Sequence, residues 1–156
     1  MRPPTRKKKA EIGEAAPIKS PGWMTRERRS KPLLGLFCRA YLELLRLEPT
    51  LRRKDFARIH KAVGRCATRS IPAAGRSPSE IVLAVDRACV FYPKEVLCLQ
   101  RSAAATCLLR KLGIPAEMAI GIQDRPFRAH AWVEVSGCVA NDKPYVAQIY
   151  TVLERC

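Results

Sequence analysis

The part of this chain that most constrains its fold is a strongly helical segment followed at once by two strand-like ones. The segment "CLQRSAAATCLLRKLG" is rich in Ala and Leu, and Gly113 before Ile114-Pro115 supplies a helix stop. "AEMAIGI" then runs apolar and "FRAHAWVEV" alternates strictly, as buried and half-buried strands do. We therefore expect a helix at 98–112 and strands at 116–122 and 127–135.

The preceding part of the chain reads as helical. An apolar stripe follows Pro32 at helical spacing: Leu33, Leu36, Phe37, Ala40, Tyr41, Leu44 and Leu45. A weaker helix is expected at about 54–66, with Phe56, Ile59 and Val63 on one face, and a Pro/Gly linker at 71–76. Ser77 and Glu80 form a capping-box pattern that begins a helix ending near residue 91. Helices first, then consecutive strands with a last short one in "IYTVLE", predict an α+β fold.

Composition favours one domain of ordinary size with a real core, since 47% of the 156 residues are hydrophobic. The net charge is +15, but residues 1–31 hold ten Lys and Arg against three acids, a net of +7. We predict a disordered basic tail at 1–31 and one domain at 32–156, helical at 32–92 with a catalytic core at 93–156. Without a recognition-helix pattern or a basic-aromatic stripe, this charge favours a solvated surface over nucleic-acid binding.

Seven scattered cysteines, an odd number, argue against a disulfide framework and for reduced, mostly buried thiols in a cytosol. CxxC pairs and Cys/His metal spacings are missing, so we expect no metal site. The sequence has neither a run of eighteen apolar residues nor an apolar segment of signal-peptide length after its basic start. These features predict a cytoplasmic protein that does not contact a membrane.

Element lengths bring three chemically useful residues together. A 15-residue helix rises about 22 Å, and a seven-residue strand returns about 23 Å. The strand therefore ends level with Cys98, where His130 begins the next strand and a hairpin returns Asp142. A two-residue turn at Ser136-Gly137 would place Asp142 on the face opposite His130. A three-residue loop ending at Gly137 would pair Glu134 with Cys138 and set Asp142 across from His130, and we favour it.

This combination suits nucleophilic catalysis. A helix N-terminus and a nearby imidazolium favour a thiolate, the histidine moves the proton, and a carboxylate orients the histidine. The alternative is that all three residues are structural, with His130 a strand residue and Asp142 the head of a turn. The other cysteines lie on apolar helical stretches or away from a helix start; Cys107 in particular is expected to be a buried thiol. Glu134 lies about 13 Å along the strand from His130, and His60 is assigned to surface or packing.

Four blocks, "CLQRSAAATCLLRKLGIPAEMAIGI", "FRAHAWVEV", "VANDKP" and "YTVLER", together resemble the transglutaminase-like cysteine peptidases of lasso-peptide biosynthesis. The resemblance covers about residues 33–156 and is densest from Leu97. It implies a transglutaminase/papain-like core in which a Cys-bearing helix packs on an antiparallel sheet. It also implies Cys98 as nucleophile, His130 as base and Asp142 as its partner, with no cofactor. The backbone N–H of Cys98 and the side chain of Gln100 are candidates for the oxyanion hole.

The resemblance also implies partners. Some members of that family carry a fused leader-binding domain, whereas this chain has only the basic tail in that place, so a separate leader-binding protein is expected. The expected substrate is a precursor peptide with a leader, and an asparagine-synthetase-like cyclase is a further candidate partner. Three functions remain open: a bacterial cytosolic leader peptidase, a transglutaminase that passes the acyl group to an amine, and a non-catalytic peptide- or nucleic-acid-binding module.

Overall fold

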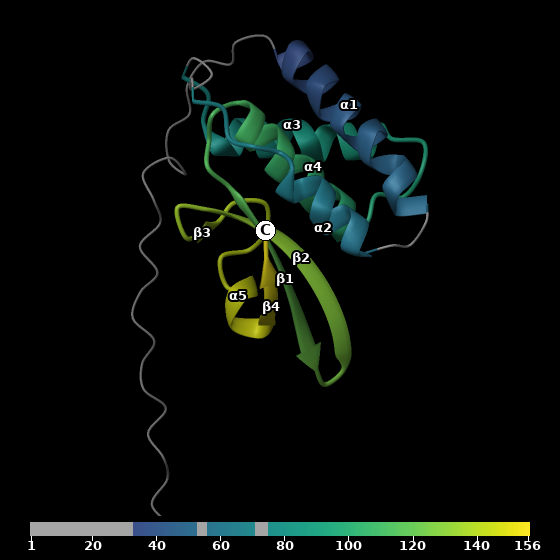
Figure 1. Cartoon of the computed structure of the whole chain (residues 1–156), viewed down its shortest axis with the longest axis vertical. Coiled ribbons are helices and arrows are strands. Elements are labelled where there is room, and N and C mark those ends of the chain that lie inside the picture. Colours follow the sequence, from purple (N-terminus) through teal and green to yellow (C-terminus); the bar gives the residue numbers. More distant parts are fainter. Residues whose placement is uncertain (1–32, 53–55, 71–74) are drawn as a thin grey trace, which may run out of the picture.

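A computed structural model describes residues 33–52, 56–70 and 75–156 of the chain. Four helices come first, and a sheet with one short helix follows (Figure 1). The helices are α1 (Leu33–Arg52), α2 (Phe56–Gly64), α3 (Pro78–Val90), α4 (Cys98–Lys111) and α5 (Val146–Ile149). The strands are β1 (Glu117–Asp124), β2 (Phe127–Val135), β3 (Cys138–Val139) and β4 (Thr151–Arg155). The predicted α+β class is confirmed.

Local signals place the ends of two helices where the sequence predicts them. At the start of α3, the Ser77 hydroxyl accepts a hydrogen bond from the Glu80 N–H, and the Glu80 carboxylate accepts one from the Ser77 N–H. This is the predicted capping box. Helix α4 stops at Leu112, and the next residue, Gly113, has a φ of +77°. That left-handed conformation is easy for glycine, which explains the sharp stop.

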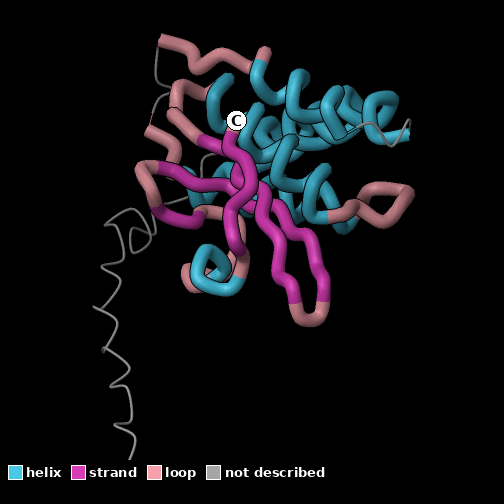
Figure 2. The backbone as a smooth tube through the Cα atoms, turned by 60° about the horizontal axis from the view of Figure 1, so that its bottom comes forward, coloured by secondary structure: helices cyan, strands magenta, loops and turns pink. Residues whose placement is uncertain are grey.

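The sheet has the strand order β3-β2-β1-β4, and every neighbouring pair is antiparallel. Strands β1 and β2 pair over their whole length, from Glu117 opposite Glu134 to Asp124 opposite Phe127. Strand β3 pairs with only the last two residues of β2. The tip of the β1–β2 hairpin therefore extends beyond the helices, as Figures 1 and 2 show.

The two faces of β2 enter different apolar clusters, which confirms the predicted alternation. Ala131, Val133 and Val135 join the main core between the sheet and the helices. Trp132, on the other face, packs in a smaller cluster with Ala119, Val139 and Val146. The strand thus fixes which way each of its residues points, including His130, which lies on the Trp132 face.

The first helix departs from its predicted stripe near its C-terminal end. Leu36, Ala40 and Leu44 are buried as expected, but Leu45 is 44% exposed and Leu47 is buried instead. Helix α1 continues to Arg52, and near its C-terminal end Leu47 rather than Leu45 faces the core. Residues 1–31, the expected tail, and most of the expected linker at 71–76 lie outside the described residues. Of the helices that are described, none combines the length and apolarity needed to cross a bilayer.

The prediction that the cysteines are unpaired is wrong for two of them. Cys66, in the turn after α2, forms a disulfide with Cys107 in the middle of α4, across a Cα–Cα distance of 5.4 Å. Cys107 is fully buried as expected, but it is bonded rather than a thiol. The pairing follows from the packing of α2 against α4, a contact between residues 41 positions apart that spacing in the sequence does not reveal.

Candidate active site

A histidine and a carboxylate meet at the point where the β1–β2 hairpin leaves the helical body. The Nε2 atom of His130 lies 2.7 Å from Oδ2 of Asp142, within hydrogen-bonding distance. Their side chains are 23% and 24% exposed, so the pair is partly shielded from water but reachable from solution. With Nε2 held by the carboxylate, Nδ1 is the ring nitrogen left to exchange a proton with a substrate or nucleophile.

The turn that leads to Asp142 differs from the predicted one. Ser136 and Gly137 both have positive φ, +51° and +75°, and form a two-residue turn in which Val135 pairs with Cys138. The favoured three-residue loop, which pairs Glu134 with Cys138, is therefore wrong. In the observed register a regular strand would place Asp142 on the face opposite His130, yet the two side chains are hydrogen-bonded.

An irregularity at Asn141 resolves this conflict. The Ala140 N–H donates to the Val133 carbonyl as a regular ladder requires, at 2.8 Å. The Val133 N–H, however, donates to the side-chain oxygen of Asn141, at 2.7 Å, instead of to a backbone carbonyl. Since the side chain of Asn141 takes the place of the backbone, the chain leaves the ladder there. Asp142 consequently reaches the His130 side of the sheet.

The same asparagine connects the pair to the helix that begins with Cys98. The amide group of Asn141 donates to the hydroxyl of Ser102, at 2.9 Å, and that hydroxyl donates to the carbonyl of Ala131, also at 2.9 Å. Ser102 and Asn141 are almost fully buried. Ser102 is one turn after Cys98 on the same side of α4, about 6 Å along the axis. The start of α4 is thereby fixed to the neighbours of both His130 and Asp142.

Arg101 adds a positive charge to this arrangement. Its guanidinium donates to the carboxylate of Asp86 in α3, at 2.6 Å, and to the backbone carbonyl of Asn141, at 2.8 Å. Burial by itself would raise the pKa of Asp142. The hydrogen bonds from His130 and the Lys143 N–H, together with the charges of His130 and Arg101, outweigh burial and lower that pKa below its ordinary value. The carboxylate is therefore ionised throughout the neutral range.

Aromatic rings surround the histidine on its other sides. The ring centroid of His130 is 5.2 Å from that of Tyr150 and 6.3 Å from that of Trp132. Gly121, directly opposite His130 on β1, makes room for both. A Cβ there would lie 2.9 Å from the Thr151 carbonyl oxygen and from the Trp132 ring, and 3.0 Å from Tyr150 Cβ. Glycine at this position thus allows the aromatic packing around His130.

Cys98 is the first residue of α4 and is partly exposed. Leu97 is the N-cap residue of α4 and makes no side-chain cap hydrogen bond, so N–H groups of the first turn remain available as donors. Among the described residues, no hydrogen bond joins the Cys98 thiol to the His130 ring. Burial, followed by the charge of Asp86, raises the pKa of Cys89 to about 11, and burial also raises that of Cys156.

Three other residues considered from the sequence lie outside this arrangement. The side-chain amide of Gln100 donates to the Leu44 carbonyl and to Glu48 of α1, so it is directed into the helical layer. Glu134 accepts hydrogen bonds from the Trp132 indole and from Arg155. His60 lies 3.1 Å from the carboxylate of Glu154, which fits its assignment to packing.

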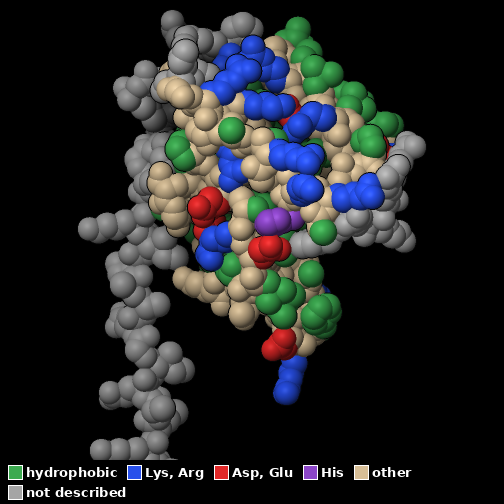
Figure 3. Space-filling view, in the orientation of Figure 1, with side chains coloured by type: hydrophobic (Ala, Val, Ile, Leu, Met, Phe, Trp, Pro, Cys, Tyr) green, Lys and Arg blue, Asp and Glu red, His purple; other side chains and the backbone are tan. Residues whose placement is uncertain are grey.

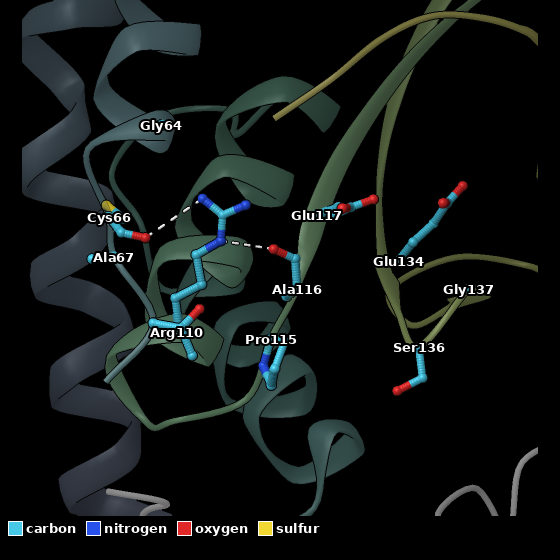
Figure 4. Close-up of a pocket in the computed structure, with 11 residues that line it drawn as sticks. Gly64, Cys66, Ala67, Arg110, Pro115, Ala116, Glu117, Glu134, Ser136 and Gly137 are labelled. Atoms are coloured by element: carbon cyan, nitrogen blue, oxygen red, sulfur yellow. Dashed lines mark hydrogen bonds between the residues drawn. The ribbon is translucent and has the colours of Figure 1, made fainter. Parts of the chain in front are cut away.

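A hollow lies near the C-terminal end of α4, without His130 or Asp142 in its lining (Figure 4). It has a volume of about 480 Å³ and is lined by Arg110, by Glu117 and Glu134, and by the turn at Ser136 and Gly137, among others. Arg110 there donates to the Ala116 and Val63 carbonyls, at 2.7 and 3.0 Å, and so ties α4 to β1 and α2. Within the described part of the chain, no three His, Cys, Asp or Glu side chains are grouped as a metal site.

Comparison with known proteins assigns the fold. Residues 41–155 match the family described as the transglutaminase-like superfamily. That match spans well over half of the sequence. The chain belongs to the transglutaminase-like superfamily. In the arrangement above, this transglutaminase-like domain joins a helix that begins with cysteine to a sheet that carries a histidine–aspartate pair.

One relative is similar over a shorter segment. The microcin J25-processing protein McjB of Escherichia coli is 39% identical over 56 residues, which are 36% of this chain and 27% of McjB. The aligned segment thus spans about a quarter of that protein. No solved structure matches the chain significantly.

Sequence reasoning named His130 and Asp142, which the structure joins, but missed the residues that place them. Ser102 and Asn141 carried a signal, because one is four residues after Cys98 on a helix and the other directly precedes Asp142. Tyr150 carried none, since its approach to His130 depends on α5 and on the glycine at position 121.

Proposed function

We propose that this protein is a cysteine peptidase that removes the leader from a ribosomally made lasso-peptide precursor, in a bacterial cytosol. The observation that carries the proposal is the His130–Asp142 pair beside the helix that begins with Cys98. Membership of the transglutaminase-like superfamily and the partial similarity to McjB support it. The disulfide between Cys66 and Cys107 lies away from Cys98 and leaves its thiol free.

In the proposed reaction, Nδ1 of His130 takes the proton of the Cys98 thiol as sulfur attacks the scissile carbonyl carbon. The Asp142 carboxylate holds Nε2–H and stabilises the imidazolium that forms. The first-turn N–H groups of α4, that of Cys98 included, donate to the developing oxyanion. The imidazolium then gives its proton to the leaving amine, and water hydrolyses the thioester to restore the thiol. Substrate binding brings the thiol within reach of the ring, as catalytic hydrogen bonds often tighten only in the complex.

The test is cleavage of a lasso-peptide precursor that carries its leader, with the products identified by mass. The unchanged protein should cut between leader and core, and Cys98→Ala should abolish cleavage while peptide binding is retained. Cys38→Ala is the matched control, because Cys38 is an exposed thiol on α1. Cleavage at an undiminished rate by Cys98→Ala would refute the assignment of the nucleophile.

A second candidate function is acyl transfer to an amine, which the family itself favours because transglutaminases form the same kind of acyl-enzyme. The two differ only in what attacks the thioester. Adding a primary amine such as cadaverine to the cleavage reaction distinguishes them. Hydrolysis leaves a product mass with a free carboxylate, whereas transfer adds the mass of the amine less water.

We further propose that a separate leader-binding protein brings the precursor to this domain. A tethered leader raises the effective concentration of the cleavage site to about millimolar for a short tether. Figure 3 shows Lys and Arg side chains gathered over the helical layer. We give the name basic face to six exposed basic residues of α1, of α2 and of the segment after α2. They are the exposed Arg39, Arg46, Arg58, Lys61, Arg65 and Arg69. This face suits an acidic leader or partner, and an asparagine-synthetase-like cyclase is a further candidate.

Dependence on the partner is measurable. Cleavage by the isolated domain should be slow or absent and strongly stimulated by the leader-binding protein. If the basic face takes part, stimulation should weaken as salt rises from about 0.05 to 0.5 M, because exposed charges are screened. Full-rate, specific cleavage by this domain alone would show that it recognises the leader itself.

A further inference from the structure

Strand β2 has an edge that is only partly paired. In an antiparallel sheet the residues of a central strand alternate between its two neighbours. Met118 exchanges both backbone hydrogen bonds with Cys156, beside β4, at 2.8 and 3.0 Å, so it does not bond to its cross-strand partner Val133. The N–H and C=O of Val133 point away from β1, toward Ala140 and Asn141. By alternation, Phe127, Ala129 and Ala131 also direct their backbone groups to this outer edge.

The outer edge loses its partners step by step toward the hairpin tip. Val135 pairs with Cys138, Val133 bonds to Ala140 and Asn141, and the Ala131 carbonyl accepts from Ser102. Beyond that point no described residue bonds to it. Ala131 itself is buried, so we call the remaining exposed groups the open edge: the N–H and C=O of Ala129 and Phe127.

The open edge runs directly past the candidate active site. His130 lies between Ala129 and Ala131, and α4 reaches the carbonyl of Ala131 one turn after Cys98. Residues Phe127, Arg128 and Ala129 are exposed, and the hairpin projects from the helical body in both views of the backbone (Figures 1 and 2). Unpaired backbone N–H and C=O groups next to a catalytic pair offer hydrogen bonds to any extended chain.

We propose that the open edge binds a segment of the substrate peptide as an added β-strand; this deepens the proposed function and rests on it. The peptide forms hydrogen bonds with both backbone groups of Ala129. Ser102 and Asn141 occupy the edge beyond, so the added strand ends level with His130. The peptide bond that leaves the edge there is the one presented to Cys98.

The occupant is a peptide rather than a second copy of this chain, for two reasons on the edge itself. Only Phe127 to Ala129 is open, about 10 Å at 3.3 Å per residue, which suits a short peptide segment. The edge also ends at the His130–Asp142 pair, so whatever binds it is directed to that pair. Backbone pairing of this kind selects extended conformation more than sequence, and Phe127, 73% exposed, supplies an apolar contact beside it.

The first experiment places one N-methyl group at a time along the precursor around its cleavage site. In a strand at an edge only every second N–H faces the partner, so the loss of kcat/KM should alternate along the peptide. Methylation of an inward N–H should lower kcat/KM about tenfold or more, the equivalent of about 1.4 kcal/mol. The neighbouring positions are the control. Equal losses at successive positions, or none, would overturn the proposal.

The second experiment changes the protein. Ala129→Pro removes the outward N–H of Ala129 but no hydrogen bond to β1, and proline is tolerated at such edge positions. Its kcat/KM should fall about tenfold or more, whereas Cys38→Ala, an exposed position on α1 away from the edge, should stay within about twofold. Thermal melting confirms that both variants fold. Undiminished cleavage by folded Ala129→Pro would overturn the proposal.

Failure of the proposed function gives a different result. If the unchanged protein, with its leader-binding partner, does not cut the unmodified precursor, the peptidase assignment fails. Hydrogen exchange of the exposed Ala129 amide, measured in the Cys98→Ala variant, then tests the edge separately from catalysis. Protection on adding precursor supports peptide pairing. No protection, or protection that rises with protein concentration before any peptide is added, overturns it, the latter by identifying a second copy as the occupant.

Discussion

Replacing Asn141 with alanine tests how the Asp142 side chain is brought to His130. The asparagine side chain makes two buried hydrogen bonds, with the Val133 N–H and with the Ser102 hydroxyl. Leaving the Val133 N–H without a partner costs about 1–3 kcal/mol, and loss of the Ser102 bond adds about 1 kcal/mol. We expect the free energy of unfolding to fall by about 2–4 kcal/mol.

Activity should fall further than stability explains. Without the side chain that substitutes for the backbone in the ladder, the segment can return to the regular register, which carries Asp142 to the opposite face of the sheet. A displacement of about 1 Å at a catalytic group can cost about 100-fold in rate. We therefore expect kcat to fall about 100-fold at a temperature where Asn141→Ala is still folded.

Urea unfolding and precursor cleavage, measured on the same preparations, check both numbers. Thr106→Val is the control. Thr106 is buried in α4, the helix that also carries Ser102, and its hydroxyl has no partner among the described residues. That variant should be at least as stable as the unchanged protein and equally active. The reasoning is refuted if Asn141→Ala loses less than about 1 kcal/mol, or if it is destabilised as expected but keeps its full kcat.

Three further predictions concern the groups around the pair. Because the pKa of Asp142 is lowered by folding, its contribution to stability is present above its unfolded value and is lost as pH falls through the lower folded value. Urea unfolding from pH 7 to 3 should therefore show a constant deficit for Asp142→Asn down to about pH 4 and a shrinking one below; a deficit that grows in acid would contradict this. Gly121→Ala should destabilise the protein by about 1–3 kcal/mol and slow cleavage, whereas Gly64→Ala, where nothing lies within 4 Å, should not destabilise it in a thermal melt. Iodoacetamide with peptide mapping should label Cys98 well before Cys89, whose pKa of about 11 keeps it protonated; equal rates would count against Cys98 as nucleophile.

The sequence predicted those parts of the fold that depend on local chemistry. The capping box at Ser77, the helix stop at Gly113 and the alternation along β2 are each determined within a few residues, and the structure has all three. Element lengths also sufficed to bring His130 and Asp142 to the same end of the sheet. Here period and length, rather than a motif, carried the information.

What failed depended on contacts distant in sequence or on uncommon backbone geometry. The hairpin register was missed because Ser136 adopts a positive φ that glycine adopts more readily, and Asn141 then reversed the expected parity. The disulfide depended on which helices pack together. Gln100 was foreseeable: residues two apart on a helix point about 200° apart, so its side chain lies opposite Cys98, where α1 packs.

The open edge has a consequence for the protein in concentrated solution. An unpaired strand edge is a template for any copy of the same chain, and natural proteins often place charge nearby to prevent such aggregation. Here the net charge of +15 makes copies repel one another at long range. Salt weakens that repulsion but not backbone hydrogen bonding. Purified protein should therefore stay dispersed at low ionic strength, where charge repulsion leaves the open edge free for the peptide.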